Sequence, residues 1–221
     1  MIKVVVVGAK GRMGQIAVEV MNAAEGFEVV GEVDKDEDLD AILKQTTPDI
    51  AIEFSGSEAV KENSWTIVNN SVRPVIGSSG LSQAEIEELE KFCKEKGLGG
   101  ILVPNFSLGM ALSNKFAKEL SRYFKDISII EFHHTKKQDK PSGTARNTAQ
   151  AVGIDESLIA SVRSGAFVAK QQMFFARDGE RVVIDHETFN RKDSFGGGIL
   201  LSCQKVMGLS ELVVGLEKIL D

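Results

Sequence analysis

The sequence predicts an α/β protein in which a doubly wound parallel sheet is joined to a second α+β domain. Two observations predict the sheet: apolar, β-branched runs alternate with helical segments, and a glycine-rich loop joins the first run to the first helix. A third observation predicts the second domain. The alternation stops near Phe106, and strand-like alternation of apolar and polar residues follows further along the chain.

The first half of the chain contains strands that are mostly separated by helical segments. Ile2–Val7 is apolar apart from Lys3, which is the pattern of a strand buried on both faces of a parallel sheet. Ser82 and Glu85 can form a capping box for a helix that Gly97 can end. Right-handed crossovers between such strands predict a doubly wound sheet. The other strands are expected at 27–33, 49–54, 74–77 and 100–104.

Gly8, Gly11 and Gly14 lie between the first strand and a run of helix formers that extends to Ala24. Their spacing departs from the common G-x-G-x-x-G, but a strand before the loop and a helix after it form the context of a dinucleotide-binding Rossmann fold. Glycines let the backbone approach a pyrophosphate, and the helix N-terminus supplies N–H groups. The loop therefore predicts an NAD(P) site.

Asp34 stands at the end of the second expected strand. A carboxylate at this position can accept a hydrogen bond from a ribose 2′-hydroxyl, which favours NAD. Lys35, the next residue, and Arg12 in the glycine loop could pair with a 2′-phosphate and so tolerate NADP. We therefore expect the protein to use both NADH and NADPH.

Three further loops follow expected strands of the same sheet, and they consist largely of small and hydroxyl-bearing residues. Ligands of open α/β sheets bind at the carboxyl ends of the strands, so these loops favour a dinucleotide that lies across the sheet edge. The loops are residues 54–56, 77–80 and 103–107.

The second domain is expected over residues 106–193, and the dinucleotide-binding domain over residues 1–105 and 194–221. Asp178-Gly179 lies between alternating segments and predicts a hairpin within a set of antiparallel strands over 161–189. Helices are expected at 108–124 and 143–152, and a strand at 127–132. Two final helices, at 195–206 and 210–220, are expected to return to the first domain.

His133 and His134 end the expected strand at 127–132. Successive side chains of a strand point in opposite directions, so the two histidines need not do the same work. Histidine can supply a proton near pH 7. A run of lysines follows, and Ser142-Gly143-Thr144 opens a helix whose free N–H groups can bind a carboxylate, although Ser142 can equally serve as its cap. The segment predicts reduction of a small, multiply negative substrate.

Composition argues against several other classes of function. The formal net charge of -6 provides no basic field to attract nucleic acid. Cys93 and Cys203 stand among apolar residues at helical spacing, so we expect buried thiols rather than metal ligands. The sequence shows no leader-like start and no long apolar run, so we expect a cytoplasmic protein without a membrane, metal or nucleic-acid partner.

Several motifs together resemble the dihydrodipicolinate reductases of the bacterial lysine and diaminopimelate pathway. The resemblance implies NAD(P)H-dependent reduction of a cyclic imine dicarboxylate to tetrahydrodipicolinate, with hydride transfer to ring carbon C4 and a proton to complete the step. It also implies a homotetramer built through the sheet of the second, substrate-binding and oligomerisation domain. The motifs lie at residues 8–14, 77–80, 104–107, 131–145, 161–165 and 186–195.

The resemblance also implies roles for individual residues. His133 looks like the general acid, and Lys137 like its partnering cation. His134, Gly143 and Thr144 look like the substrate-binding set, to which the charges and the helix start add Ser142 and Arg191. The cofactor positions are Gly8, Ala9, Lys10, Gly11, Arg12, Met13, Asp34, Lys35, Gly77, Ser78, Ser79, Val103, Pro104, Asn105 and Phe106.

One segment departs from the family pattern. After Gly165 the family usually carries a Glu-His pair, whereas this chain reads Ala-Phe-Val-Ala-Lys-Gln over 166–171. Two alternatives therefore stay open: a non-catalytic NAD(P)-binding sensor on the same scaffold, or a related dehydrogenase that acts on another imine or aldehyde.

Overall fold

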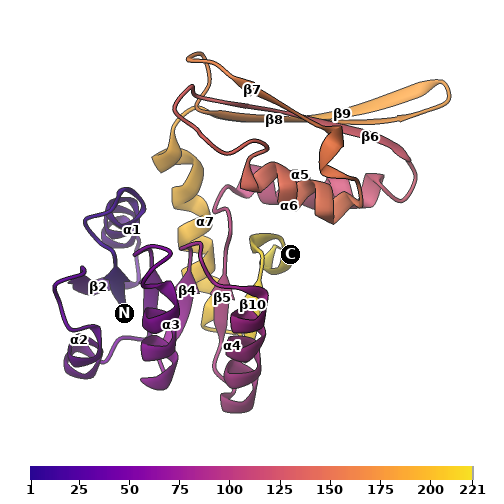
Figure 1. Ribbon diagram of the computed structural model, residues 1–221. Helices are drawn as coiled ribbons and strands as arrows, with labels where there is room; N and C mark the ends of the chain where they lie inside the picture. Colours follow the sequence, from indigo (N-terminus) through magenta and orange to yellow (C-terminus); the bar gives the residue numbers. More distant parts are fainter. Residues whose placement is uncertain (221) are drawn as a thin grey trace. The chain divides into compact units, whose positions relative to one another are not determined.

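The computed structural model describes residues 1–220, which form two compact units. One unit contains Met1–Phe106 and the chain from Phe195 onward, and the other contains Ser107–Ser194. The first is built on a six-stranded sheet and the second on a four-stranded sheet (Figure 1). The assignment of cofactor binding to the first unit and of substrate binding and oligomerisation to the second remains a proposal.

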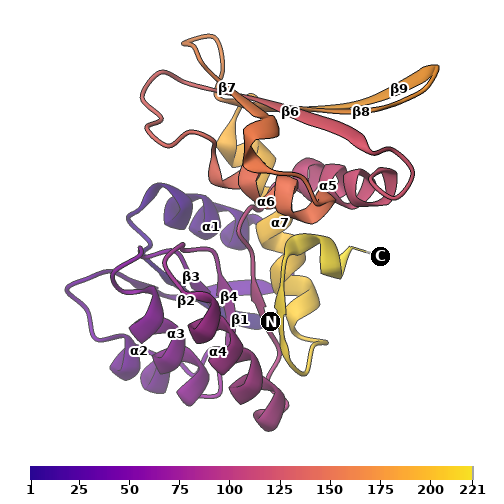
Figure 2. The same ribbon diagram turned by 45° about the vertical axis from the view of Figure 1, so that its right-hand side comes forward.

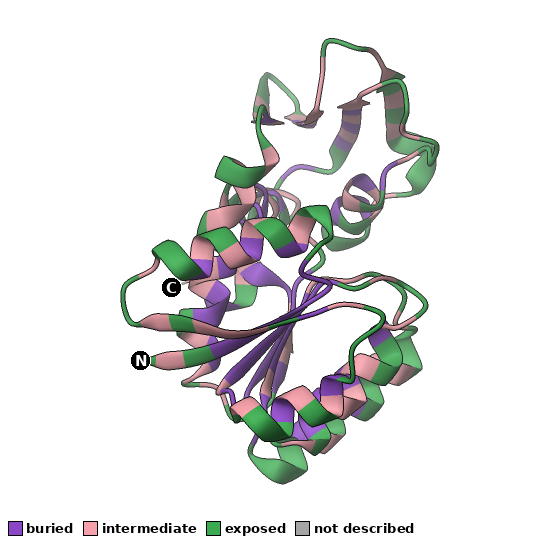
Figure 3. Ribbon diagram, turned by 90° about the vertical axis from the view of Figure 1, so that its left-hand side faces the viewer, coloured by how far each residue is buried: buried purple, intermediate pink, exposed green. Residues whose placement is uncertain are grey.

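The sheet of the first unit is parallel throughout, as expected for a doubly wound fold. The strands are β1 (Ile2–Val7), β2 (Phe27–Val33), β3 (Ile50–Glu53), β4 (Arg73–Ile76), β5 (Gly100–Leu102) and β10 (Leu212–Val214), in the order β10-β5-β4-β3-β1-β2. The order reverses between β1 and β3, so a ligand crevice is expected at their carboxyl ends. Figure 3 shows the central strands buried along most of their length.

Helices cover both faces of this sheet. They are α1 (Arg12–Ala23), α2 (Leu39–Thr46), α3 (Val60–Asn69), α4 (Gln83–Lys96) and α7 (Arg191–Val206). Helices α2, α3 and α4 lie on one face, and α1 and α7 on the other (Figures 1 and 2). The expected capping box of Ser82 and Glu85 is present at the start of α4, and Gly97 ends it in the left-handed conformation. No helix in the described part of the chain is long and apolar enough to cross a membrane.

The helix expected at 210–220 is wrong. Leu212–Val214 instead forms β10, which pairs with β5 at the edge of the sheet, and a short 3₁₀ helix follows at Leu216–Ile219. Apolar spacing alone did not distinguish these possibilities, because a short apolar run fits either a buried strand or a helix. The two valines suit the pleated edge, and Gly215, with φ of 101°, turns the chain after them.

The second unit packs two helices on one face of its sheet (Figure 2). The strands are β6 (Asp126–His133), β7 (Ile159–Arg163), β8 (Ala169–Arg177) and β9 (Glu180–Thr188), in the order β7-β6-β8-β9, and the helices are α5 (Leu108–Leu120) and α6 (Gly143–Val152). The expected hairpin at Asp178-Gly179 joins β8 and β9. The expectation that every strand after 161 is antiparallel is wrong for β7. It pairs parallel to β6, because α6 carries the chain back before β7 begins.

The core of this unit shows which side chains of β6, the strand that ends at His133, face the two helices. Ile127 and Ile129 on β6 are buried in one cluster with Met173 and Phe175 on β8 and with residues of α5 and α6. Since alternate residues of a strand share a face, Glu131 and His133 continue the row that begins with Ile127.

Candidate active site

The glycine loop is held so tightly that side chains would not fit at two of its positions. A Cβ on Gly14 would lie 2.1 Å from the carbonyl oxygen of Gly8, and one on Gly8 would lie 2.5 Å from that of Phe54. Gly8 also has φ of 76°, and Gly11 is the N-cap of α1 without a capping side chain. The first backbone N–H groups of α1 therefore have no side-chain cap and can bind an anion.

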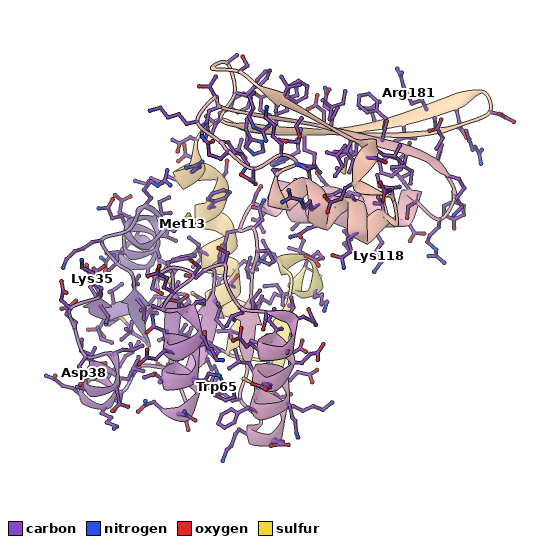
Figure 4. All side chains as sticks on the ribbon, viewed as in Figure 1. Met13, Lys35, Asp38, Trp65, Lys118 and Arg181 are labelled. Carbon is purple, nitrogen blue, oxygen red and sulfur yellow. The ribbon has the colours of Figure 1, made fainter. Side chains whose placement is uncertain are left out.

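A cavity of about 540 Å³ opens beside this loop, at the switch point of the sheet. Gly8, Gly11, Asp34 and Lys35 all line it, so the structure brings these predicted cofactor residues together. The Asp34 carboxylate accepts from the backbone N–H of Lys10 at 3.0 Å. Figure 4 labels Lys35, and also Met13 at the start of α1. Glu62, Asn63 and Thr66 of helix α3 also line the cavity. The sequence did not predict these three residues, because α3 carries no recognisable motif.

The loops after β3, β4 and β5 meet at the same sheet edge. The rings of Phe54 and Phe106 pack edge to face, with their centroids 5.3 Å apart. A Cβ on Gly77 would lie 2.1 Å from the first ring and 2.6 Å from the second, so only glycine fits there. Val103 donates to the carbonyl of Ile76 at 2.8 Å. The predicted cofactor positions 77–79 and 103–106 therefore lie in neighbouring loops.

In the second unit, His133 lies beside a buried carboxylate. Its Nδ1 is hydrogen-bonded to Glu131, which is fully buried and also accepts two bonds from Arg163 at 2.8 and 3.0 Å. Burial alone would raise the pKa of Glu131, but hydrogen bonds from Arg163, Ser161 and His133 outweigh burial and lower it. Glu131 is therefore ionised and can only accept. It follows that Nδ1 of His133 carries a hydrogen and that Nε2 is the nitrogen left for chemistry.

The environment of His133 favours the neutral ring. Burial is the main cause that lowers its pKa, and the positive charges of Lys137 and Arg163 add to that effect. The Glu131 carboxylate opposes them and raises the pKa, but less strongly. In the substrate-free protein the ring is therefore predominantly neutral near pH 7.

Lys137 and the start of α6 already hold a carboxylate, that of Asp139. The Lys137 ammonium lies 2.8 Å from Asp139. Lys137 is the main cause that lowers the pKa of Asp139, and a hydrogen bond from the backbone of Gly143 also contributes. The sequence assigned Lys137 to catalysis and Gly143 to substrate binding. Ser142 caps α6, since its hydroxyl accepts from Ala145 N–H at 3.2 Å.

Two of the predicted substrate-binding residues make no recorded side-chain contact with Lys137, Asp139 or the start of α6. Arg191 begins α7 and forms no ion pair with the residues that the structure describes, and His134 makes no side-chain hydrogen bond with them. Conversely, Glu131 and Arg163 lay within the recognised motifs, but sequence reasoning assigned neither a role. The i, i+2 spacing of Glu131 and His133 on one strand was the available signal.

A Rossmann unit with a glycine cradle, joined to a unit in which a histidine lies beside cations and an anion site, defines an NAD(P)H-dependent oxidoreductase. Two family descriptions match nearly the whole chain: "Dihydrodipicolinate reductase, N-terminus" over residues 2–106 and "Dihydrodipicolinate reductase, C-terminus" over residues 107–220. The chain belongs to the dihydrodipicolinate reductase family, whose members are enzymes that use NADH or NADPH.

Individual relatives agree with this assignment. A 4-hydroxy-tetrahydrodipicolinate reductase of Legionella pneumophila (strain Lens) is 39% identical over 241 residues, covering 99% of each chain. The enzyme of that name from Bacillus subtilis (strain 168) is 35% identical, covering 100% of this chain and 98% of its own. A dipicolinate-bound dihydrodipicolinate reductase from Paenisporosarcina sp. TG-14 superposes with a TM-score of 0.92 at 30% identity, covering 100% of both chains.

Proposed function

We propose that this enzyme reduces a cyclic imine dicarboxylate of the dihydrodipicolinate type in diaminopimelate and lysine biosynthesis, with His133 and Lys137 as its catalytic residues. The observation that carries the proposal is the anion site beside His133: Lys137 and Gly143 hold the carboxylate of Asp139. The similarity to 4-hydroxy-tetrahydrodipicolinate reductases over the full chain, and the dipicolinate bound by a relative of the same fold, support a cyclic dicarboxylate as the anion.

The first unit fits a nicotinamide nucleotide. The cradle that a Cβ on Gly8 or Gly14 would fill leaves backbone N–H groups for a pyrophosphate, and Asp34 supplies an acceptor for the ribose. Lys35 and Arg12 would serve a 2′-phosphate, and the remaining positions in 8–13, 77–79 and 103–106 would hold the rest of the cofactor. When bound, the reduced nicotinamide supplies the hydride.

The second unit would bind the dicarboxylate. One substrate carboxylate would replace Asp139 on Lys137 and the N-terminus of α6, where Gly143 and Thr144 offer backbone donors. His134 and Arg191 would bind the other polar groups of the ring. A cation beside the ring also stabilises the negative charge that develops as hydride arrives.

His133 would deliver the proton. Two substrate carboxylates raise the pKa of a nearby imidazole, so binding loads a proton onto Nε2 while Glu131 keeps the hydrogen on Nδ1. When hydride adds at C4, the electron pair that forms on the adjacent ring carbon takes the proton from Nε2. The neutral ring then regains a proton from water.

The lowered pKa of His133 predicts the pH dependence of the reaction. Because a protonated His133 is required, kcat/KM should fall as pH rises through the pKa in the free enzyme, which lies below the ordinary value of 6.5. The decline in kcat should lie at higher pH, since the bound dicarboxylate favours the imidazolium. Initial rates from pH 5 to 9 would check this; a kcat/KM limb above pH 7 would contradict the assignment.

Replacing Lys137 with alanine should lower kcat by about 100-fold, since the transition-state charge loses its cation. The adjacent and exposed Lys136 provides a matched control, and Lys136→Ala should retain the wild-type rate. Steady-state kinetics, with NADH binding measured by calorimetry, would check both variants. Equal rates for the two variants would remove Lys137 from the mechanism.

An assay coupled to dihydrodipicolinate synthase, which follows NADH and NADPH oxidation separately, tests the function itself. We expect turnover with both nucleotides. Nucleotide binding without oxidation would favour the non-catalytic sensor, and oxidation only with other imines or aldehydes would favour the related dehydrogenase.

We further propose a cytoplasmic homotetramer built through the open face of the second sheet. Figure 1 shows α5 and α6 on one face only. By alternation the other face carries Ile130, Phe132, Phe174 and Val183, of which Val183 is 42% exposed. Phe174→Glu should yield smaller particles in light scattering, whereas Lys118→Glu on α5 should not. A wild-type monomer at micromolar concentration would contradict the proposal.

A further inference from the structure

Arg163 lies at the end of β7, directly opposite His133 in the parallel pairing of β6 and β7. Its side chain is only 8% exposed, and its two terminal nitrogens donate to the two oxygens of Glu131. This two-pronged pair uses the planar fork of a guanidinium, which lysine lacks. Arg163 therefore holds the carboxylate that accepts the Nδ1 hydrogen of His133.

The other donors of Arg163 hold the segment that carries Lys137. Nε donates to the carbonyl of Lys137 at 3.3 Å, and Nη2 donates to the carbonyl of Asp139 at 2.5 Å. Nη1 also donates to the carbonyl of Val162 at 2.9 Å. A guanidinium has five N–H donors, and together with the Glu131 pair every one of them has an acceptor.

We propose that Arg163 is a positioning residue for the reaction, which sets the proton-delivering ring of His133 and the ammonium of Lys137 relative to each other. Arg163 acts on His133 through Glu131, and it acts on Lys137 through the backbone carbonyls of Lys137 and Asp139. This inference rests on the proposed function, because it concerns the two residues that the function requires.

A purely structural role explains the arrangement less well. Removing both charges of Arg163 and Glu131 from water is costly, and apolar residues of similar volume often replace such buried pairs without loss of stability. β7 is moreover an edge strand of its sheet. The charged pair is better explained by what else it binds: one imidazole and two carbonyls of the Lys137 segment.

The charges around His133 provide a readout that a structural role would not move. They come from Glu131 on β6, Lys137 in the following segment and Arg163 on β7. Glu131 raises the pKa of His133, so Glu131→Gln should lower the pKa further and move the decline in kcat/KM to lower pH. The pKa can be measured by NMR, because the chain has only three histidines.

The main test is Arg163→Lys, which keeps the charge but loses the fork. We expect kcat to fall by about 100-fold, as for a small misplacement of catalytic groups, with unchanged NADH affinity. Arg181→Lys, at an exposed position of β9 in the same sheet, is the matched control and should behave as wild type (Figure 4).

Three results would overturn the inference: wild-type kcat in Arg163→Lys, parallel losses of kcat and NADH affinity, or an unmoved His133 pKa in Glu131→Gln. A wild-type protein that oxidises neither nucleotide would instead refute the proposed function. The NMR titration would still test the contact of Glu131 with His133, because it requires no turnover.

Discussion

His133→Gln is expected to lower kcat by about 10²- to 10⁴-fold, the usual contribution of a positioned general acid. Glutamine has no proton to give at neutral pH, although its amide can still donate to Glu131. The cofactor cradle lies on other elements, in the unit built on the six-stranded sheet, so NADH affinity should not change. Single-turnover kinetics and calorimetric NADH titration would measure the two effects separately.

His134→Gln offers the informative comparison for this variant. A neighbouring histidine that binds substrate should raise KM much more than it lowers kcat. If His134→Gln lost kcat while His133→Gln kept it, the two roles would have to be exchanged. Loss of NADH affinity in His133→Gln would show damage beyond the proton donor.

Gly14→Ala is expected to impair both stability and nucleotide binding. The new Cβ would lie 2.1 Å from the Gly8 carbonyl oxygen and 2.7 Å from the Ala9 Cα, so α1 must move away from the loop. Overpacking of this kind typically costs about 1–3 kcal/mol of folding free energy. The shift also displaces the N–H groups that would bind the pyrophosphate, so NADH affinity should fall at least tenfold, or about 1.4 kcal/mol.

Gly208→Ala is the matched control, because Gly208 follows α7 in the same unit, lies outside the predicted cofactor positions, and a Cβ there meets only the Lys205 carbonyl oxygen at 3.7 Å. Urea unfolding and NADH titration should distinguish the two variants. Wild-type stability and affinity in Gly14→Ala would mean that the loop is not the rigid cradle described above.

The parts of the fold that were predictable are those governed by local patterns. β1 is a β-branched run, α4 has a capping box and a glycine end, and the β8–β9 hairpin has an Asp-Gly turn. Each pattern lies in residues that adjoin along the chain. The misassigned elements, β10 and β7, depend instead on distant partners. β10 pairs with β5 at an edge of the six-stranded sheet, and β7 pairs with β6 at an edge of the four-stranded sheet.

The candidate site divides in the same way. The identity of the chemistry-bearing groups came from the sequence, because His133, Lys137 and the glycine loop stand in contiguous motifs whose residue types indicate proton transfer, anion binding and nucleotide binding. The protonation state of these groups could not be predicted from the sequence. The neutral ring of His133 and the single nitrogen left for chemistry follow from burial and from the ionised Glu131 beside it.

The sequence by itself thus determined the class of fold, the family resemblance and the residues able to carry the reaction. Only the tertiary structure decided that Arg163, thirty residues from His133 along the chain, joins Glu131 to the Lys137 backbone. The physical reason is that hydrogen bonds and pKa shifts depend on distance and burial in space, which a one-dimensional pattern does not contain.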